Sequence, residues 1–559
     1  MTGSQALIES LLEYGVDTVF GYPGGAIMPV YDALYDYRDK LNHILVRHEQ
    51  GASHAAEGYA RVTGRAGVCM ATSGPGATNL VTGIADAMMD SVPMVAITGQ
   101  VFRKLLGTDA FQETDVMSVT IPITKWNYQI TTPDEIPYIV AKAFSIAEGG
   151  RPGPVVIDIT KNAQIEEFTG NIKEELAKYK PWKKPEVDAE KISRAADLIN
   201  SAKSPFLLVG HGVLISRAQE VVRDFVEKTG MPVASTLHGL SAFPTGHPNY
   251  VGMLGMHGNY GPNLLTNEAD VLIGLGMRFD DRVTGTLDNY AKESKIIHID
   301  IDQAEISKNV TTEVGLVADA KSAIEALMPL VEKRSHDAWV SRFRECDEKE
   351  DEKVIKEDLY PSTEKIKMSE VIRVLSEQTE GKAVVVADVG QHQMMAARYY
   401  QFQEPDSYIT SGGLGTMGFA VPAAMGAQVG APKRQVLAVV GDGCFQMTLQ
   451  ELGTIVQEKL PVKIIVLNNN FLGMVRQWQE LFFDHRYSFV EMQNPDFVAI
   501  SKGFGMEATR VSERENLEAE VRKMLDFDGP YFLEVMVEKE TNVFPMVPAG
   551  QGVADVRLD

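Results

Sequence analysis

Short apolar runs alternate with amphipathic stretches along most of the chain. Continuous apolar runs end in, or are followed by, Gly, Asp or Asn at residues 95–98, 155–158, 206–209, 271–274, 384–387, 436–440 and 464–467. Runs of this length are typical of parallel strands that are buried on both faces. Segments between them, such as 4–14 and 448–458, carry apolar residues at helical spacing and predict crossover helices. The pattern predicts an α/β fold of doubly wound parallel sheets, with functional loops at the carboxyl ends of the strands.

Two charged, proline-containing stretches, 166–191 and 332–367, interrupt this pattern and predict linkers. We therefore predict a first domain at 1–165, a linker at 166–190, a central domain at 191–335, a linker at 336–366, a third domain at 367–540 and a tail at 541–559. Segments 73–98 and 441–467 each combine a Gly-containing turn, a helical pattern, a Pro and a buried strand. This internal similarity predicts that the first and third domains share a topology around a different central domain.

The charge balance and the cysteine usage exclude whole classes of partner. The 559 residues include 53 Lys plus Arg and 76 Asp plus Glu, which gives a net charge of −23. Binding nucleic acid needs clustered Lys and Arg, so we expect no nucleic-acid partner. No stretch of 18 apolar residues is free of charge, and the N-terminus lacks the features of a signal peptide. With only three cysteines, the chain is predicted to be a cytoplasmic enzyme with no membrane partner and no disulfide framework.

The strongest chemical signal combines two strand-end motifs in the third domain. Asp442 and Gly443 follow the run 436–440, and Asn469 follows the next predicted strand. Gly443 lets the backbone approach a phosphate closely, and a helix predicted to begin near Gln446 would point its N–H groups at that phosphate. The Asp442 carboxylate and the Asn469 amide oxygen, with a backbone carbonyl and phosphate oxygens, suit octahedral Mg²⁺. Either motif alone is more often an ordinary turn or loop, but the pair at this spacing, each after a buried strand, predicts a Mg²⁺–diphosphate site.

These motifs resemble the signature of thiamine-diphosphate enzymes, and the resemblance covers nearly the whole chain. Further segments resemble the catalytic subunits of acetohydroxyacid synthases, the biosynthetic acetolactate synthases. They are VFGYPGGAIMPVYDAL, RHEQGASHAAEGYAR, SGPGATNLVTGIADA, GTDAFQET, RPGPVVID, GMLGMHG, RFDDRVTG, SGGLGTMGFAVPAA and NNNFLGMVRQWQ. RFDDR and GMVRQW are the segments that distinguish acetohydroxyacid synthases from their relatives, because the other segments recur in related decarboxylases and oxidases. The resemblance implies three-domain thiamine-diphosphate enzyme architecture, with a pyrimidine-binding first domain, an FAD-binding central domain and a diphosphate- and Mg²⁺-binding third domain.

The resemblance implies a carboligase that acts on small-molecule 2-keto acids. Pyruvate would be decarboxylated on thiamine diphosphate, and the hydroxyethyl unit would join a second pyruvate to give 2-acetolactate, or 2-ketobutyrate to give 2-aceto-2-hydroxybutyrate. This is the first common step of branched-chain amino-acid biosynthesis. The active site would lie between two chains of a homodimer or homotetramer, with a small regulatory subunit as a further partner.

Three alternatives stay open at this point. A catabolic acetolactate synthase lacks FAD, and a pyruvate oxidase uses its FAD in redox chemistry. A non-catalytic module that has kept the fold is disfavoured, because Glu49, Asp442 and Asn469 are all present.

The resemblance divides the thiamine-diphosphate site between the first and third domains. Glu49 would hydrogen-bond N1′ of the aminopyrimidine and promote the tautomer that takes the C2 proton. The Gly24-Gly25 loop would stabilise the substrate oxyanion, and Met417 would hold the cofactor in a bent conformation. Further matches are catalytic Gln112 and Lys161, the cofactor contacts Gly390, Gln391, His392, Gly443, Cys444, Gly473 and Met474, and the metal ligands Asp442, Asn469 and, through its carbonyl, Phe471. From the residues alone, His392 is equally a structural histidine and Cys444 is a packing residue.

The central domain would hold FAD. Matching positions are Arg151, just before this domain, and His257, Arg278, Asp300 and Asp319 within it. Strands that end in Gly or Asp suit dinucleotide binding, because a strand-end carboxylate holds a ribose and Gly admits a phosphate. The flavin would be structural, because the implied reaction has no net redox change.

Four residues match substrate-binding positions. Arg282 would grip the carboxylate of the incoming 2-keto acid, and Trp478 would contact its alkyl group. Phe111 and Met256 match other substrate positions. The residues alone also allow Arg282 to pair with a neighbouring aspartate and Trp478 to be a core aromatic. Phe102 stands where many members of the family have Pro on the channel to the cofactor, which bears on inhibitor sensitivity and channel shape.

Overall fold

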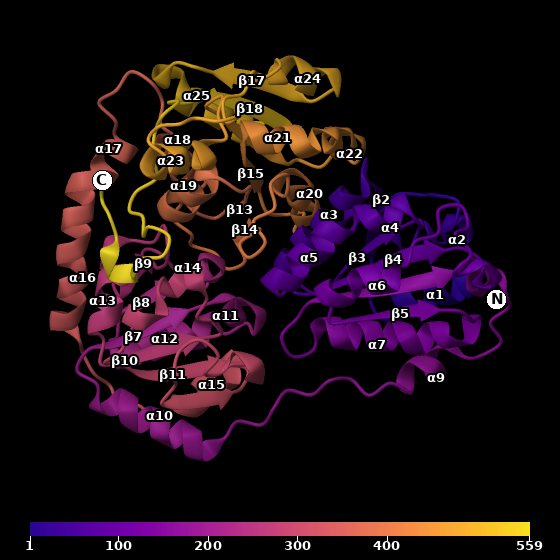
Figure 1. Ribbon diagram of the computed structural model, residues 1–559, viewed down its shortest axis with the longest axis horizontal. Helices are drawn as coiled ribbons and strands as arrows, with labels where there is room; N and C mark the ends of the chain where they lie inside the picture. The colour runs from indigo at the N-terminus through magenta and orange to yellow at the C-terminus, as the bar shows by residue number, and fades with distance from the viewer.

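Three parallel sheets of six strands each form the framework of the computed structural model, which describes residues 1–559 (Figure 1). The first sheet has the strand order β2-β1-β3-β4-β6-β5. Its strands are β1 (Thr18–Gly21), β2 (Asn42–Leu45), β3 (Gly67–Ala71), β4 (Met94–Gln100), β5 (Trp126–Ile130) and β6 (Pro154–Thr160). Its helices are α1 (Gly3–Glu13), α2 (Met28–Leu34), α3 (Glu49–Thr63), α4 (Pro75–Asn79), α5 (Val81–Asp90), α6 (Val116–Thr120), α7 (Ile136–Glu148) and α8 (Lys161–Ile165). Parallel neighbours need crossover connections, which these helices supply.

The central sheet has the order β12-β11-β10-β7-β8-β9. Its strands are β7 (Pro205–Val209), β8 (Val233–Ser235), β9 (Tyr250–Met253), β10 (Val271–Leu275), β11 (Lys295–Asp300) and β12 (Val314–Val317). Its helices are α10 (Ala189–Ser201), α11 (His211–Ile215), α12 (Gln219–Thr229), α13 (Tyr260–Leu265), α14 (Asp281–Thr284) and α15 (Ala320–Leu327). Counted within the domain, this is the 3-2-1-4-5-6 order of dinucleotide-binding sheets, whose ligands bind where the strand order reverses.

The third sheet has the order β14-β13-β15-β16-β18-β17. Its strands are β13 (Val384–Ala387), β14 (Tyr408–Thr410), β15 (Val436–Gly441), β16 (Lys463–Asn468), β17 (Glu507–Val511) and β18 (Tyr531–Met536). Its helices are α18 (Met368–Gln378), α19 (Gln391–Tyr399), α20 (Ala420–Gly430), α21 (Asp442–Thr448), α22 (Leu452–Gln457), α23 (Gly473–Phe482), α24 (Phe497–Gly503) and α25 (Leu517–Asp526). Counted within each domain, the first and third sheets have the same strand order, so the predicted α/β fold and its internal similarity are confirmed.

Local chemistry explains where the first helix begins. α1 starts one residue before the predicted segment, because Thr2 and Gln5 form a capping box: the Gln5 N–H donates to Thr2 Oγ1 at 3.3 Å, and the Thr2 N–H donates to Gln5 Oε1 at 2.9 Å. The chain then turns at Gly15, whose φ of +85° is accessible to glycine.

The predicted linkers contain regular structure. The first includes α9 (Ile172–Ala177), and the second is largely helical, with α16 (Asp337–Glu350), a π-helical stretch Asp351–Ile355 and α17 (Lys356–Leu359). The second linker packs on the central domain, because Trp339 and Phe343 of α16 enter its core. Most charged residues of α16 face solvent, but Glu350 is buried and pairs with Arg398 at 2.5 Å. The predicted helix 448–458 is also interrupted, by a 3₁₀ turn at Leu449–Glu451.

The strands of the three sheets lie within 18–160, 205–317 and 384–536. The domain boundaries given above remain a prediction.

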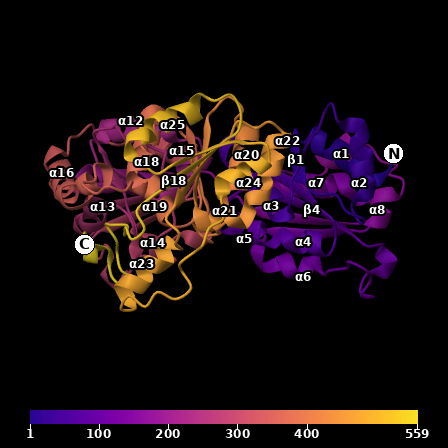
Figure 2. The ribbon, with the colours of Figure 1, turned by 90° about the horizontal axis from the view of Figure 1, so that it is seen from above.

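The first and third domains share one hydrophobic core. α20 is buried on nearly all sides and packs along α3, between the two domains (Figures 1 and 2). Two glycines permit this contact: a Cβ at Gly58 would lie 1.9 Å from the Ala423 oxygen, and a Cβ at Gly426 would lie 1.8 Å from the Ala55 oxygen. The helix that begins at Glu49 is therefore held firmly against the third domain of the same chain. No helix combines the length and the apolar character needed to cross a bilayer.

Candidate active site and cofactor sites

A small cavity of about 50 Å³ lies at the carboxyl ends of β13, β15 and β16, where the order of the third sheet reverses. Ligands of doubly wound sheets bind at such a point. The cavity brings together all the third-domain residues that were predicted to bind the cofactor or metal, namely Gly390, Gln391, His392, Met417, Asp442, Gly443, Cys444, Asn469, Phe471, Gly473 and Met474. Four separate segments of sequence meet here.

Asp442 is the first residue of α21, so this helix begins four residues before the predicted start at Gln446. The N–H group of Gly443 therefore belongs to the first helical turn, where anions are favoured. Burial raises the pKa of the Asp442 carboxyl to about 6, and Asn494 donates a hydrogen bond to it at 2.6 Å. A buried strand-end carboxylate of this kind has the chemistry of a ligand for a hard dication.

The surroundings of Asp442 fit a Mg²⁺–diphosphate group. Asn469 is buried, and its side-chain Nδ2 has no hydrogen-bond partner within the protein. The backbone is also closely packed at two glycines: a Cβ at Gly443 would lie 2.7 Å from Leu472 Cδ2, and a Cβ at Gly473 would lie 2.2 Å from Gln391 Oε1. Buried polar atoms without a partner are rare in folded proteins, so this cradle fits an anionic ligand with its cation.

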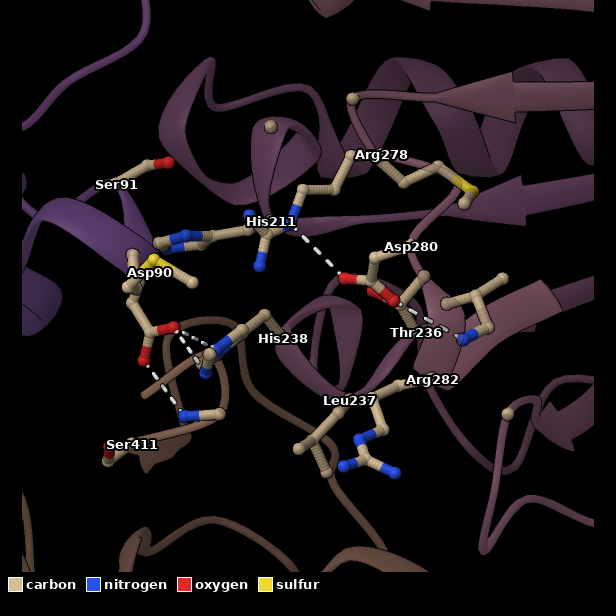
Figure 3. A pocket seen from close by; sticks show the side chains of 18 of the residues that line it. Asp90, Ser91, His211, Thr236, Leu237, His238, Arg278, Asp280, Arg282 and Ser411 are labelled. Carbon is tan, nitrogen blue, oxygen red and sulfur yellow. Dashed lines mark hydrogen bonds and ion pairs between the residues drawn. The ribbon is translucent and has the colours of Figure 1, made fainter. Parts of the chain in front are cut away.

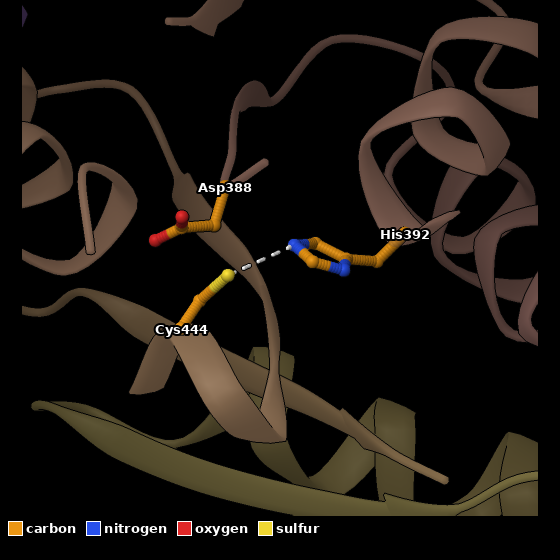
Figure 4. Close-up of side chains that lie close together, drawn as sticks. All are labelled: Asp388, His392 and Cys444. Atoms are coloured by element: carbon orange, nitrogen blue, oxygen red, sulfur yellow. Dashed lines mark hydrogen bonds between the residues drawn. The ribbon is translucent and has the colours of Figure 1, made fainter. Parts of the chain in front are cut away.

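Asp388, His392 and Cys444 form a buried cluster beside this cavity (Figure 4). The Asp388 carboxylate already accepts hydrogen bonds from three backbone N–H groups, including that of Gly418 next to Met417. Burial raises the pKa of the Cys444 thiol and lowers the pKa of His392 to about 3. A neutral thiol and a saturated carboxylate are poor metal ligands, so the cluster supports the loops around the diphosphate site by packing and hydrogen bonding.

The first domain gathers its predicted catalytic residues at the carboxyl edge of its own sheet. Lys161, after β6, donates from Nζ to the Gly25 carbonyl at 3.2 Å. Glu49 begins α3 after β2 and accepts a 2.9 Å hydrogen bond from Asn79. Gln112 adopts a φ of +59° and lies against the loop after β3, where a Cβ at Gly74 would be 2.9 Å from the Gln112 oxygen.

The two halves of the predicted thiamine site do not meet within one chain. Neither of the two main cavities is lined by Gly25, Glu49, Gln112 or Lys161. Phe111, the predicted substrate residue of this domain, is 88 % exposed. At this edge of the first domain Gly25 and Phe111 are exposed, whereas Glu49 is buried.

A large cavity of about 730 Å³ lies at the carboxyl edge of the central sheet, where its strand order reverses (Figure 3). It is lined by the five predicted FAD residues Arg151, His257, Arg278, Asp300 and Asp319. Arg151 is held by Ser91 at 2.7 Å and by Glu305 at 2.9 Å. Burial raises the pKa of Asp300 to about 6. The volume lies in the range that organic cofactors occupy in proteins.

The cavity fits a dinucleotide in two further respects. At the point of reversal the backbones of two loops nearly touch, because a Cβ at Gly210 would lie 2.3 Å from the Gly276 oxygen and a Cβ at Gly212 would lie 2.6 Å from the Gly276 Cα. The Nδ1 atoms of His211 and His257 are buried, and neither has a hydrogen-bond partner within the protein. Close backbone approach and free polar atoms at strand ends are features of a site for a phosphate-bearing ligand.

Three predicted substrate residues line the same large cavity: Met256, Arg282 and Trp478. Arg282 Nη1 lies 3.3 Å from Met256 Sδ, and its Nε lies 3.9 Å from Asp281 Oδ2. Trp478 is 41 % exposed, so the interpretation of Trp478 as a core aromatic is wrong. The predicted pairing of Arg282 with a neighbouring aspartate is therefore present as a long, solvent-exposed ion pair, which leaves the guanidinium group accessible to an incoming anion.

Met417 lines both cavities, as do Gly390 and Met474. The cavity with the substrate residues and the cavity of the diphosphate site are therefore adjacent, with these three residues between them.

Sequence reasoning missed several residues that line or support these sites. Asn79 and Asn494 hold the carboxylates of Glu49 and Asp442. In the large cavity, Asp90 pairs with His238 at 3.0 Å and accepts hydrogen bonds from the backbone of the loop at Gly412 (Figure 3). The only sequence signal for His238 is its position shortly after the strand β8.

Comparisons with known proteins agree with this geometry. Three family models match the chain: "Thiamine pyrophosphate enzyme, N-terminal TPP binding domain" at residues 1–119, "central domain" at 192–327 and "C-terminal TPP binding domain" at 388–535. The acetolactate synthase large subunit of Corynebacterium glutamicum is 48% identical over 100% of this chain and 90% of that protein. The acetolactate synthase isozyme 2 large subunit of Escherichia coli is 45% identical over 98% of both chains. The chloroplastic acetolactate synthase 1 of Nicotiana tabacum is 46% identical over 99% of this chain and 84% of that protein. With three matching domains and near-complete coverage, the chain belongs to the acetolactate synthase large-subunit family of thiamine pyrophosphate enzymes.

Proposed function

We propose that the chain catalyses the acetohydroxyacid synthase reaction. Pyruvate loses CO₂, and the remaining two-carbon unit is joined to the carbonyl carbon of a second 2-keto acid. With pyruvate as acceptor the product is 2-acetolactate, and with 2-ketobutyrate it is 2-aceto-2-hydroxybutyrate. The observation that carries this proposal is that the large cavity, lined by the flavin residues, Arg282 and Trp478, lies next to the diphosphate cavity, with Met417 lining both.

The chain's own residues have distinct tasks in this proposal. Bound thiamine diphosphate supplies the electron-accepting chemistry that protein side chains lack. Glu49 shares a proton with the aminopyrimidine, and Asp442, Asn469 and the Phe471 carbonyl hold Mg²⁺ at the diphosphate. Arg282 binds the carboxylate of the acceptor and so orients its carbonyl carbon.

FAD is proposed as a structural cofactor. The fit of the large cavity to a dinucleotide supports its presence, and a reaction without net electron transfer supports a role that is not redox. A catabolic acetolactate synthase would lack the flavin, and a pyruvate oxidase would reduce it. Purified protein should therefore be yellow, and its flavin absorbance should not bleach when pyruvate is added without oxygen. A colourless active protein or a bleached flavin would contradict this part of the proposal.

The catalytic unit is proposed to be a dimer whose active sites combine Glu49 of one chain with Asp442 of its partner. In support, the first-domain half of the site lines neither of the two cavities of its own chain. Large apolar side chains are also exposed on the loops and helices that carry the two halves, namely Tyr22, Met28, Leu105, Phe111, Val119 and Ile121 in the first domain and Leu414, Met447, Val475, Phe482, Phe483 and Phe489 in the third. Monomeric proteins rarely leave large apolar patches uncovered, so this surface favours self-association.

A complementation experiment tests both the site and the dimer. Glu49→Gln and Asp442→Ala chains are each expected to be inactive alone. When equal amounts are mixed, unfolded and refolded together, half of the dimers are mixed, and each mixed dimer has one site with both Glu49 and Asp442 intact. Acetolactate formation should then recover to about one quarter of the wild-type rate per chain.

Recovery is the distinguishing outcome. If the two residues served the same site from one chain, every chain in the mixture would carry a defect, and activity would stay near zero. Sedimentation that showed a fully active monomer would also contradict the proposal. A homotetramer built from such dimers gives the same recovery.

The "large subunit" in the names of the relatives supports a smaller regulatory partner, which we include in the proposal.

A further inference from the structure

One buried carboxylate of the third domain lies outside both cavities but contacts the segment that carries Glu49. Glu451 is fully buried at the end of the 3₁₀ turn that follows α21. Its side chain reaches into the first domain and accepts hydrogen bonds from the backbone N–H of Arg47, at 3.0 and 3.1 Å, and of His48, at 3.1 Å. These two residues directly precede Glu49, the first residue of α3.

The contact is fixed from both sides. Thr454 donates from Oγ1 to Glu451 Oε2 at 2.8 Å, which holds the carboxylate in one orientation. In return, the Arg47 side chain donates to the Gly453 carbonyl at 3.2 Å and to Gln457 Oε1 at 2.8 Å. A buried carboxylate that lost these partners would carry a large desolvation cost, so its geometry is strongly constrained.

Gly51 brings the first turn of α3 against the same carboxylate. A Cβ at Gly51 would lie 2.6 Å from Glu451 Oε1 and 2.8 Å from its Cδ. No larger side chain fits at this position without displacing Glu451. The acidic group also lies at the amino end of α3, where the helix dipole favours negative charge. Glu451 therefore holds both the segment before Glu49 and the turn after it.

We propose that Glu451 is a positioning residue for Glu49. It fixes the start of α3, and thereby the direction of the Glu49 carboxyl group, without contacting the cofactor or the substrate itself. This inference rests on the proposed function, in which Glu49 acts on the aminopyrimidine.

The position of Glu451 gives this role a second consequence. The stretch from α21 to the 3₁₀ turn begins at Asp442 and ends at Glu451. In a dimer with shared active sites, Asp442 serves one site and Glu49 of the same chain serves the other. Glu451 then connects the metal ligand of one site mechanically to the acid–base residue of the second.

The test uses the holoenzyme and four variants. Glu451→Ala removes the contact, Glu451→Gln retains an oxygen that accepts the two backbone N–H groups, and Gly51→Ala displaces the carboxylate while leaving it in the chain. Asp358→Asn is the matched control, because Asp358 is a buried carboxylate that accepts a 2.6 Å hydrogen bond from Tyr399 away from both cavities. The readouts are kcat and KM for pyruvate, bound flavin, and hydrogen exchange of the backbone amides of residues 45–52 by mass spectrometry.

Glu451→Ala and Gly51→Ala should lower kcat by about 10- to 100-fold, the cost of misplacing a catalytic group by roughly 1 Å. KM for pyruvate and flavin content should stay close to wild type, and the amides of residues 45–52 should exchange faster. Glu451→Gln should restore most of the lost kcat and most of the protection. Asp358→Asn should leave kcat and these amides unchanged.

Several outcomes would overturn the positioning role. They are a Glu451→Ala enzyme with wild-type kcat, a defect that appears equally in Asp358→Asn, or a Glu451→Gln enzyme as impaired as Glu451→Ala. Failure of the proposed function looks different, because the wild-type protein itself would then form no acetolactate. Accelerated exchange of residues 45–52 without a loss of kcat would show that the contact is structural only, and it too would overturn the proposal.

Discussion

The side-chain amide of Asn494 donates a hydrogen bond of 2.6 Å to Oδ2 of Asp442. The same amide lies 3.0 Å from Asn468 Oδ1 and 3.2 Å from Asn470 Oδ1, and its own oxygen accepts a 2.9 Å hydrogen bond from Gln446. One residue far along the chain therefore ties the strand-end carboxylate after β15 to the loop after β16. Residues that orient a metal ligand commonly influence metal affinity nearly as much as the ligand itself.

Replacing Asp442 and Asn494 should weaken Mg²⁺ binding to different degrees. Asp442→Ala should abolish tight binding of Mg²⁺ and thiamine diphosphate, because a hard dication loses its charged ligand. Asn494→Ala leaves every proposed ligand in place and should raise the Kd for Mg²⁺ by about 10- to 100-fold. Titration of the apoprotein with Mg²⁺ at saturating thiamine diphosphate, followed by tryptophan fluorescence, measures both. Unchanged affinity in Asp442→Ala would refute the metal assignment.

Glu49→Gln should fold normally and bind both cofactors, yet turn over very slowly. The substitution keeps the shape of the side chain and its contact with Asn79 but removes the shared proton. Positioned acid–base groups contribute about 10²- to 10⁴-fold, so the loss should appear in kcat and leave KM for pyruvate little changed. Steady-state kinetics with a parallel measurement of bound cofactor decides this. Near-normal turnover would exclude the proposed role of Glu49.

The pattern of the sequence predicted the strand-end residues well, and for a physical reason. Continuous apolar runs define buried parallel strands, and in a parallel sheet the carboxyl ends of all strands lie at one edge. Asp442 and Asn469, or Asp300 and Asp319, had to be near neighbours once their strands lay in one sheet. The residues of the third domain that the family resemblance named as cofactor or metal contacts accordingly line one cavity.

The supporting residues could not be predicted in this way. Asn494 and Glu451 act through contacts over 52 and about 400 positions in sequence, and no local period marks either of them. The helical second linker was missed because its core-facing residues, Trp339 and Phe343, are sparse in a highly charged segment. The start of α21 at Asp442 was missed because Gly441 serves as its N-cap without a side chain. Each of these depends on tertiary context.

Asp158 should make the stability of the protein depend on pH. This carboxylate is fully buried in β6 among Thr98, Gln100 and Gln129, and burial raises its pKa to about 6. Because the folded-state pKa lies above the unfolded value, the stabilising contribution is complete below about pH 4 and is lost as the pH rises through about 6. The loss amounts to about 3 kcal/mol.

Asp158→Asn has no such titration. The difference in Tm between wild type and this variant, measured from pH 4 to pH 7.5, should therefore shift in favour of the variant up to about pH 6 and then level off. A difference that stays constant over this range would contradict the prediction.

Trp478→Leu should keep acetolactate formation from pyruvate and lower the preference for 2-ketobutyrate. The indole is 41 % exposed and lines the large cavity together with Met256 and Arg282, so it presents an apolar surface to the acceptor. The extra methyl group of 2-ketobutyrate can cover that surface, and pyruvate has no such group. One group of this size is worth about 1–3 kcal/mol, or roughly 10- to 200-fold in relative kcat/KM. A competition assay with both acceptors measures the ratio, and an unchanged ratio would exclude this contact.

Arg282 should affect both products together. Its guanidinium group is more than half exposed in the same cavity and lies 3.9 Å from its nearest acidic neighbour, Asp281, while Asp280 is paired with Arg278 at 3.1 Å. Both acceptors carry the same carboxylate, so Arg282→Ala should lower the rates of 2-acetolactate and 2-aceto-2-hydroxybutyrate formation by the same factor. Arg282→Lys should recover only part of the loss, because a point charge replaces a planar fork that binds a carboxylate through two parallel hydrogen bonds. The competition assay used for Trp478→Leu separates the two roles. If Arg282→Ala changed the product ratio while one of the two rates stayed at the wild-type value, Arg282 would be a selectivity residue and not the common carboxylate anchor.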